Sequence, residues 1–515
     1  ILLLKISTKT SLNKSHTNFT EFFNEATGST YTGYNIYING SYHCCLRYKQ
    51  LHSLHEQLRR QMQLEQLNSG SGITLPPFPP KKLLPLTNGQ VELRRAALEH
   101  YLQLVGQVPA LGKLELFQTF LLNAQQESAI AALSAEGRDF LPDSCIDVLL
   151  MNGYQIQLQC RSSDNASTLL HKACQCVNLS STLEPYFCLY LMRKDAKDTL
   201  VLLRRLMDFE APVISRQQAG LPPCQLVLRK SYWNPAYDIE LMQDSIGLNL
   251  LFIQTVSDVE REWIIATPDV RKQLRGMQER GQKREYMELA RQLPLYGCLQ
   301  FMASSIDYPS DVSSLSSVLI AIGNKELSMR TFQGAKIYET KFRVTRMRCW
   351  RVTSMHHNNA NGNNGPHEAH PSNLQLSFEY LLSRQTLRWI TITSAQAMLM
   401  SVCLQSMVDE LLQHKEASAD STPPTPPLQQ QEASPPLSYV FRDGSGSQTI
   451  RAASTYSSNE LISVSPNPTQ SRFFAQRRKI KPKTAYSSAS PIVFFRNTEE
   501  SVHNEAFEDI GDDDL

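Results

Sequence analysis

The chain has 515 residues, of which 41% are hydrophobic and 19% are charged. This length is too great for a single hydrophobic core, so we expect three or four folded units. A formal net charge of +2 excludes a broadly polybasic or polyacidic protein, so any attraction to a membrane must come from a local patch.

The first predicted unit spans residues 1–127. An alternating, strand-like run leads to Asn39-Gly40, a strong hairpin signal, and a second strand follows it. A helical segment comes next, and then the run 76–80 (Pro-Pro-Phe-Pro-Pro), which favours polyproline II and excludes helix. Two more helical stretches close the unit, at 91–107 and 113–125.

One group of side chains in this unit suits a phosphorylated ligand. Arg47 and Tyr48 follow the second strand, Lys81 ends the proline-rich loop, and Arg94 lies seven residues before Tyr101 in a helical stretch. Guanidinium groups bind phosphate oxygens in bidentate fashion, and an aromatic ring can pack on the apolar face of an inositol. The residues alone leave a second interpretation open, in which they are ordinary surface cations.

Three further folded units and a tail follow. A hairpin with Asn152-Gly153 at its tip, then a helix and more strands, predicts a ubiquitin-like unit over 142–228. Helical periodicity dominates 229–292, and 293–415 combines strands, including one over 342–352, with a closing helix. Ser, Pro, Thr and Gln dominate 416–515, which predicts a disordered tail. The chain is therefore expected to be an α+β multidomain protein.

The closing helix carries two apolar stripes. One steps by three and four residues and is typical of a helix buried on one side. Val408 and Leu412 lie beside that stripe and form a second apolar shoulder. If a sheet edge runs alongside, a peptide can add to it as a strand and place a side chain against Trp350, Val408 and Leu412. The alternative is that the pair only widens the buried stripe.

Two short motifs contain an Asn followed three residues later by an aromatic residue. Asn234-Pro235-Ala236-Tyr237 lies between predicted units, where Asn-Pro favours a structural turn. The other begins at Asn504 and ends at Phe507, inside an acidic C-terminus whose remaining apolar residues include Ile510 and Leu515. Apolar residues that interrupt an acidic run suit a linear motif for a basic, grooved partner. We hypothesise that Asn504–Phe507 also occupies the chain's own groove, because tethering raises its effective concentration.

No cofactor or metal is expected. The eleven cysteines show no paired zinc-ligand spacing, which favours free thiols in a reducing compartment. A His- and Asn-rich insert at 355–373 carries four histidines, but it is typical of a variable surface loop. No P-loop, nucleophile elbow or HExxH motif appears, so an enzyme is not expected.

Several of these strings resemble those of the PX-FERM sorting nexins. The resemblance rests on Arg47-Tyr48, the proline-rich loop with Lys81, the run from Arg94 to Tyr101, Arg343–Ser354 and 403–411. It implies a PX domain followed by an atypical FERM module of three lobes: ubiquitin-like, helical and PTB-like. The chain departs from many PX domains by having Lys49 where they carry a small hydroxyl residue.

The resemblance also implies roles for the candidate residues. Arg47 would hold the 3-phosphate of phosphatidylinositol 3-phosphate, Tyr48 would pack under its ring, Lys81 would meet the 1-phosphate and Arg94 the ring hydroxyls. The PTB-like lobe would bind NPxY or NxxY motifs in receptor tails at Trp350, Val408 and Leu412.

A monomeric endosomal cargo adaptor is therefore expected, cytoplasmic and peripheral on early endosomes, whose C-terminal tail engages the retriever recycling complex and which binds no nucleic acid. Two alternatives are an effector of a Ras-like GTPase and a link between membrane and cytoskeleton.

Overall fold

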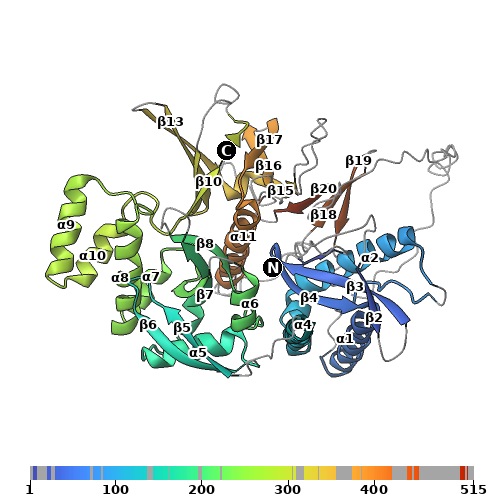
Figure 1. The fold of residues 1–515 in the computed structure, drawn as a ribbon. Helices are drawn as coiled ribbons and strands as arrows, with labels where there is room; N and C mark the ends of the chain where they lie inside the picture. The colour runs from blue at the N-terminus through green and yellow to red at the C-terminus, as the bar shows by residue number, and fades with distance from the viewer. Residues whose placement is uncertain are drawn as a thin grey trace, which may run out of the picture.

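The computed structural model shows four folded units around one long helix (Figure 1). It describes residues 4–7, 20–24, 29–69, 74–82, 85–135, 143–161, 163–194, 200–220, 223–303, 305–308, 318–333, 336–354, 374–383, 386–419, 438–443, 446–451, 499–504 and 507. The first unit and the helical lobe lie at opposite sides of the molecule, and α11 (Ala397–Ala419) runs between them.

The first unit packs helices on a small antiparallel sheet. Its elements are β1 (Leu4–Ser7), β2 (Thr20–Asn24), β3 (Ser29–Ile38), β4 (Ser41–Arg47), α1 (Tyr48–Ser69), α2 (Asn88–Gln107), α3 (Pro109–Gly112) and α4 (Glu115–Ala135). Strands β1, β2 and β4 all pair with β3. The predicted Asn39-Gly40 turn is confirmed, and both residues have positive φ, 49° and 81°.

The ubiquitin-like lobe follows the predicted order of hairpin, helix and strands. It contains β5 (Asp143–Leu149), β6 (Gln155–Arg161), α5 (Ala166–Cys176), β7 (Phe187–Lys194), β8 (Leu200–Arg205), α6 (Pro212–Gln218) and β9 (Gln225–Lys230). The sheet order is β6-β5-β9-β7-β8, and β5 and β9 run parallel. Burial alternates strictly along β6, so one face of this strand packs on the core.

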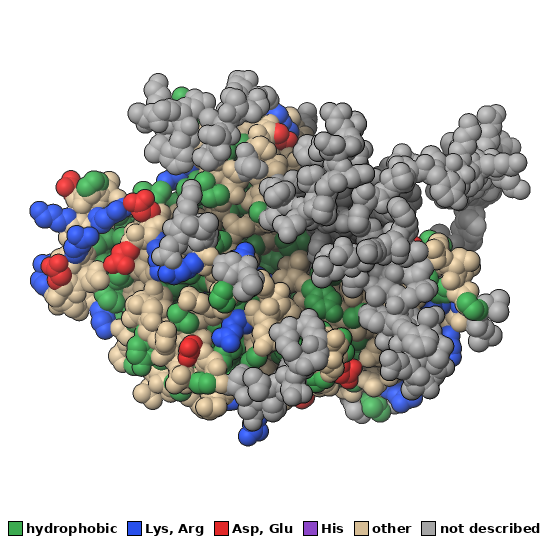
Figure 2. Space-filling view, viewed as in Figure 1, with side chains coloured by type: hydrophobic (Ala, Val, Ile, Leu, Met, Phe, Trp, Pro, Cys, Tyr) green, Lys and Arg blue, Asp and Glu red, His purple; other side chains and the backbone are tan. Residues whose placement is uncertain are grey.

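The helical lobe consists of helices of unequal length, and side chains cap the starts of α8 and α9. They are α7 (Tyr237–Leu241), α8 (Ser245–Glu260), α9 (Pro268–Glu279) and α10 (Lys283–Ala290). Asp244 caps α8 by accepting hydrogen bonds from the backbone of Ile246 and Gly247. Figure 2 shows basic and acidic side chains interspersed over α9 and α10, so this face of the lobe carries no patch of a single sign.

The PTB-like lobe places α11 against two sheets. Its strands are β10 (Leu299–Ala303), β11 (Ser305–Ile306), β12 (Val318–Gly323), β13 (Glu326–Gln333), β14 (Lys336–Arg343), β15 (Met347–Ser354), β16 (Leu374–Ser383) and β17 (Thr386–Thr393). One sheet has the order β10-β12-β13-β14, and β11, β17, β16 and β15 follow one another in the other. The predicted continuous strand over 342–352 is wrong, because a 3-10 turn at Val344–Arg346 separates β14 from β15.

Within the tail that the sequence predicts to be disordered, the structure places three strands: β18 (Ser438–Asp443), β19 (Gly446–Arg451) and β20 (Glu499–His503). Strand β20 pairs antiparallel with both β15 and β18 and so extends the sheet of the PTB-like lobe. A sequence too polar to form a core still gains ordered backbone partners at a sheet edge, which composition alone does not reveal.

Two negative findings concern the described residues. No helix among them is long and apolar enough to cross a bilayer. In the same part of the chain, no three His, Cys, Asp or Glu side chains gather as metal ligands would. The His-rich insert at 355–373 lies outside the described residues.

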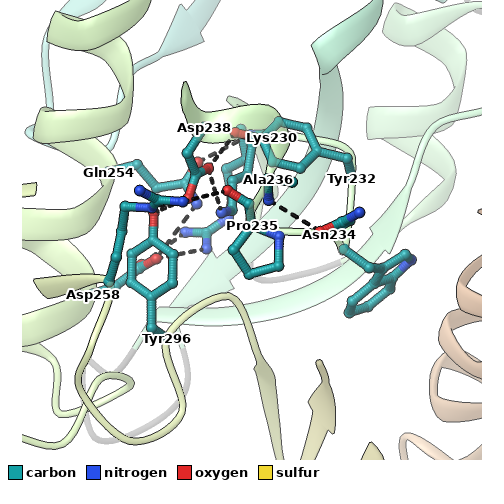
Figure 3. A network of polar contacts seen from close by, with 12 residues as sticks. Lys230, Tyr232, Asn234, Pro235, Ala236, Asp238, Gln254, Asp258 and Tyr296 are labelled. Carbon is teal, nitrogen blue, oxygen red and sulfur yellow. Dashed lines mark hydrogen bonds and ion pairs between the residues drawn. The ribbon is translucent and has the colours of Figure 1, made fainter. Parts of the chain in front are cut away.

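A buried carboxylate fixes the helical lobe between its neighbours (Figure 3). The side chain of Asp238 is fully buried and accepts hydrogen bonds from the hydroxyls of Tyr232, at 2.5 Å, and Tyr296, at 2.7 Å. It also pairs with Lys230 Nζ at 3.2 Å and Arg291 Nε at 3.1 Å. Burial and the carboxylate both raise the pKa of Tyr232, so its phenol remains a donor. Residues on both sides of the lobe are thereby tied to its first helix.

Candidate headgroup site and peptide groove

The four candidate headgroup residues come from three elements of the first unit. Arg47 ends β4, Tyr48 begins α1 and Arg94 lies in the second turn of α2. The guanidinium carbon of Arg94 lies 4.3 Å from the centre of the Tyr48 ring, and the Tyr48 hydroxyl donates to the Pro79 carbonyl at 2.8 Å. Lys81 is exposed two residues beyond that carbonyl. The structure therefore brings strand, loop and helix together around one aromatic ring.

Arg94 has an incomplete set of hydrogen bonds. One of its terminal nitrogens, Nη2, is buried and has no partner in the protein. Leaving such a donor unpaired costs about 1–3 kcal/mol, and more for a charged group. The Tyr48 ring and the Tyr34 hydroxyl contact the guanidinium. A small shift of the side chain would let an anionic oxygen satisfy this nitrogen.

The edge of strand β15 is the candidate peptide groove, and the chain's own tail lies on this edge as strand β20. In the register of β20 on β15, His503 lies opposite Cys349 and Val502 opposite Trp350. Beyond the strand, the backbone N–H of Phe507 donates to the Asn504 carbonyl at 3.0 Å, which closes a tight turn. In the predicted Asn504–Phe507 segment, Asn504 thus directly follows β20 and its carbonyl is hydrogen-bonded to Phe507.

Asn504 donates hydrogen bonds from both its side chain and its backbone. Its side chain is fully buried, and Nδ2 donates to the carbonyls of Val344, at 2.6 Å, and Met347, at 2.7 Å. Its backbone N–H donates to the Arg348 carbonyl at 2.9 Å. An amide presents two N–H donors in one plane, so a side chain that lacks them cannot satisfy both carbonyls.

The break between β14 and β15 supplies these acceptors. The 3-10 turn at Val344–Arg346 takes the chain out of the strand, and the Val344 N–H donates to the Lys325 carbonyl at 2.9 Å. The Val344 carbonyl accepts the Met347 N–H across the turn, and its second lone pair accepts from the Asn504 amide. The Met347 carbonyl is the second acceptor of that amide. Sequence reasoning missed this feature because the run reads as one strand, and no residue type in it signals the break.

The three predicted groove residues differ in their placement. The Trp350 side chain is fully buried, and its indole N–H donates to Ser401 Oγ of α11 at 3.1 Å. Val408 is only 1% exposed, whereas Leu412 is partly buried at the border of the same core. Trp350 and Val408 thus belong to the lobe's interior with the tail in place. Leu412 is nearest to solvent among the three. Ile510 and Leu515 lie outside the described residues.

The Asn234–Tyr237 string is confirmed as a structural turn. The Tyr237 N–H donates to the Asn234 carbonyl at 3.2 Å. The Glu410 carboxylate of α11 accepts from the backbone N–H groups of Trp233, at 2.8 Å, and Asn234, at 2.6 Å. The Tyr237 ring stacks on His414 of the same helix, with centroids 5.1 Å apart. Sequence reasoning did not identify Glu410 or His414, since both lie more than 170 residues along the chain from this turn.

Four family models match the chain in succession. They are the PX domain, residues 34–124; the F1 lobe of the sorting nexin 17/27/31 FERM domain, residues 144–233; the F2 lobe of the sorting nexin 17/31 FERM domain, residues 234–294; and the sorting nexin 17 FERM C-terminal domain, residues 297–412. The matches follow the order of the four folded units.

Named relatives match over nearly the whole chain. Human sorting nexin-17 is 38% identical over 492 residues, which cover 95% of this chain and 97% of the relative. Zebrafish sorting nexin-17 is 35% identical and covers 96% of this chain and 98% of its own. Human sorting nexin-31 is 32% identical over 75% of this chain and 83% of its own.

Proposed function

The chain belongs to the PX-FERM sorting nexin family, and we propose that it is an endosomal cargo adaptor that binds phosphatidylinositol 3-phosphate and NPxY or NxxY motifs of receptor tails. The comparisons support a sorting adaptor with PX and FERM domains. We propose the identities of the lipid, the peptide motif and the recycling partner from the arguments that follow.

The membrane half of the proposal rests on the cluster around Tyr48. Arg94 lies over the ring, and Arg47 immediately precedes Tyr48 in the chain. Lys81 lies at the end of the loop whose Pro79 carbonyl accepts from the Tyr48 hydroxyl. We assign Arg47 to the 3-phosphate, Tyr48 to the inositol face, Lys81 to the 1-phosphate and Arg94 to the ring hydroxyls. The unpaired Nη2 of Arg94 supports this assignment, because a ring oxygen would satisfy it.

The proposal that the chain binds receptor peptides rests on the position of its own tail along β15. Strand β20 adds to the edge of β15, and the side chain of Asn504, the residue directly after it, donates to the carbonyls of Val344 and Met347. A receptor tail with an Asn-x-x-Tyr motif offers the same amide, the same turn and an aromatic ring of nearly the same shape. Strand addition gives such a peptide backbone hydrogen bonds, and the buried amide gives it specificity. Trp350, Val408 and Leu412 form the apolar wall under it.

The tail and a receptor peptide therefore compete for one groove. With Asn504 buried, the tail is held on the PTB-like lobe as far as Phe507, whose backbone N–H donates to the Asn504 carbonyl. A receptor peptide that displaces Asn504 frees the whole C-terminus, including Ile510 and Leu515. We propose that the freed C-terminus recruits the retriever recycling complex, so that coat recruitment follows cargo capture on the early endosome.

Calorimetric titration of an NPxY peptide into the full chain tests the groove assignment. Leu412→Glu places a carboxylate at the border of the apolar wall and should weaken binding about tenfold or more. Gln413→Glu, the next residue and exposed, adds the same charge on the same helix and should leave binding within about twofold.

Equal affinity in both variants would show that the peptide binds elsewhere. Absence of binding to the wild type and to Asn504→Ala, in which the groove is less occupied, would refute the cargo role.

A further inference from the structure

The PX domain docks on the rest of the molecule through a shared core. Phe209, which follows β8 of the ubiquitin-like lobe, is 2% exposed and belongs to the hydrophobic cluster of the PX domain. Its ring meets His43 of β4 edge-on, with centroids 5.9 Å apart, and Met207 packs against the same cluster. Two matched domains thus share one interior, which is not expected of modules joined only by a linker.

A buried amide lies at the polar part of this interface. Gln125 of α4 is fully buried, its Oε1 accepts from the Ala211 N–H at 2.8 Å, and its Nε2 donates to Ser215 Oγ at 2.9 Å. The Ser215 hydroxyl in turn donates to Glu210, which pairs with Arg204 through two contacts of 2.7 Å. Burial alone would raise the pKa of Glu210, but the Arg204 guanidinium outweighs it and lowers that pKa. Both polar atoms of the Gln125 side chain therefore form hydrogen bonds to the ubiquitin-like lobe.

The PX hairpin reaches a second lobe as well. A Cβ added to Gly40 would lie 2.7 Å from Cγ of Met398, which is in the first turn of α11. The Asn39 side chain contacts Met207 Sδ at 3.4 Å. The same helix carries Val408 and Leu412 about 15–20 Å further along its axis, at 1.5 Å per residue. The PX domain thus touches both the ubiquitin-like lobe and the helix that forms one wall of the peptide groove.

From these contacts we infer that the PX domain and the FERM module form one rigid unit, in which Gln125 and the Gly40 turn are positioning residues that fix the groove relative to the headgroup site. This inference rests on the proposed function for the identity of the two ligands. A receptor tail and the lipid emerge from the same bilayer, so the second ligand binds at a high effective concentration only where the spacing and angle of the sites match. Rigid docking supplies that match before either ligand arrives.

Two pairs of variants separate positioning from binding. Gln125→Glu places a second carboxylate one hydroxyl away from Glu210, whereas Gln126→Glu makes the same change at the adjacent, half-buried position. Gly40→Asn adds a side chain against Met398, whereas Gly153→Asn adds it at a hairpin tip with the same left-handed φ, +85°, and nothing within 4 Å. Asn tolerates this φ, so both glycine variants carry similar backbone strain.

The full chain is then measured in three ways. Hydrogen exchange measures the protection of the Ala211 amide, whose N–H donates to Gln125. Calorimetry measures the affinities for soluble inositol 1,3-bisphosphate and for a soluble NPxY peptide separately. Flotation measures the affinity for phosphatidylcholine vesicles that carry both phosphatidylinositol 3-phosphate and a lipid-anchored NPxY peptide. We expect Gln125→Glu and Gly40→Asn to lose protection at Ala211, to keep each soluble affinity within about twofold and to lose about tenfold or more in vesicle affinity. The two control variants should match the wild type in all three measurements.

Three results would overturn the inference. An unprotected Ala211 amide in the wild type would mean that the domains do not dock in solution. Protection retained in both test variants would mean that neither residue holds the interface. Lost protection with unchanged vesicle affinity would mean that orientation does not matter. A wild type that binds neither soluble ligand would instead refute the proposed function, and Ala211 protection would still report the docking.

Discussion

Asn504→Ala should strengthen the binding of receptor peptides by loosening the tail from the groove. The substitution removes two side-chain hydrogen bonds, to the carbonyls of Val344 and Met347, and leaves the backbone pairing of β20 in place. Each such bond contributes a net 0.5–1.5 kcal/mol, so the closed form should lose about 1–3 kcal/mol. This corresponds to a shift of roughly 5- to 150-fold in the equilibrium between the closed and open forms.

The apparent peptide affinity reports this shift directly. A peptide binds only the open form, so its apparent Kd equals the intrinsic Kd divided by the open fraction. Calorimetric titration of one NPxY peptide should therefore give a lower apparent Kd for Asn504→Ala than for the wild type, by up to that factor. Asn497→Ala, which changes the same residue type before β20 begins, is the matched control and should match the wild type. Unchanged or weaker binding in Asn504→Ala would refute the idea that the tail closes the groove.

Three further outcomes are expected. Arg94→Gln should weaken phosphatidylinositol 3-phosphate binding about tenfold or more in vesicle flotation, because a charged donor set is lost, whereas Arg60→Gln on the exposed side of α1 should have little effect. Trp350→Ala should lower the free energy of unfolding by about 3–5 kcal/mol in chemical denaturation, because the indole is fully buried; a loss under 1 kcal/mol would contradict its place in the core. Burial lowers the pKa of His43 to about 4, so the folded form should lose stability as pH falls from about 6.5 towards 4, by about 1.4 kcal/mol per pH unit. Denaturation of the wild type and His43→Gln across this range should show the extra slope in the wild type alone.

The place of Trp350 also decides how the groove can be probed. A substitution that removes a fully buried indole and its bond to Ser401 endangers the fold of the lobe, so lost peptide binding in Trp350→Ala would not locate the site. Leu412 is partly buried and sits where a charge reaches solvent. The comparison of Leu412→Glu with Gln413→Glu therefore tests the groove while the core stays intact.

Local signals in the sequence predicted much of the fold. The hairpin at Asn39-Gly40 follows from a dipeptide that tolerates positive φ, and the two residues do adopt it. The turn at Asn234-Pro235 follows from a residue pair that disfavours helix. The closing helix was predicted from its apolar spacing alone, and α11 extends four residues beyond the predicted end at 415. Such features depend on neighbours within a few residues, which is the range over which propensity operates.

The parts that sequence reasoning missed depend on contacts between distant residues. Nothing near Glu410 indicates that its carboxylate receives two backbone N–H groups from residues 233 and 234. The break before β15 has no Pro or Gly to mark it, and its purpose becomes visible only with Asn504 on its carbonyls. The docking amide of Gln125 reads as one more polar residue on an amphipathic helix. Satisfaction of buried polar groups is a property of the assembled chain, so a linear pattern cannot display it.

These distant contacts converge on α11. Met398 lies next to the PX hairpin, and Ser401 accepts from the buried indole of β15. Ser406 Oγ accepts from the indole N–H of Trp233 at 3.1 Å, and Glu410 accepts from the backbone of the same linker before the helical lobe. Val408 and Leu412 belong to the apolar wall of the groove. A helix is stiff over this length, so a shift at one end displaces the other. Loss of the Glu410 carboxylate, which binds the backbone of residues 233 and 234, should therefore change the affinity for the peptide. The groove then depends on the whole assembly rather than on the PTB-like lobe alone.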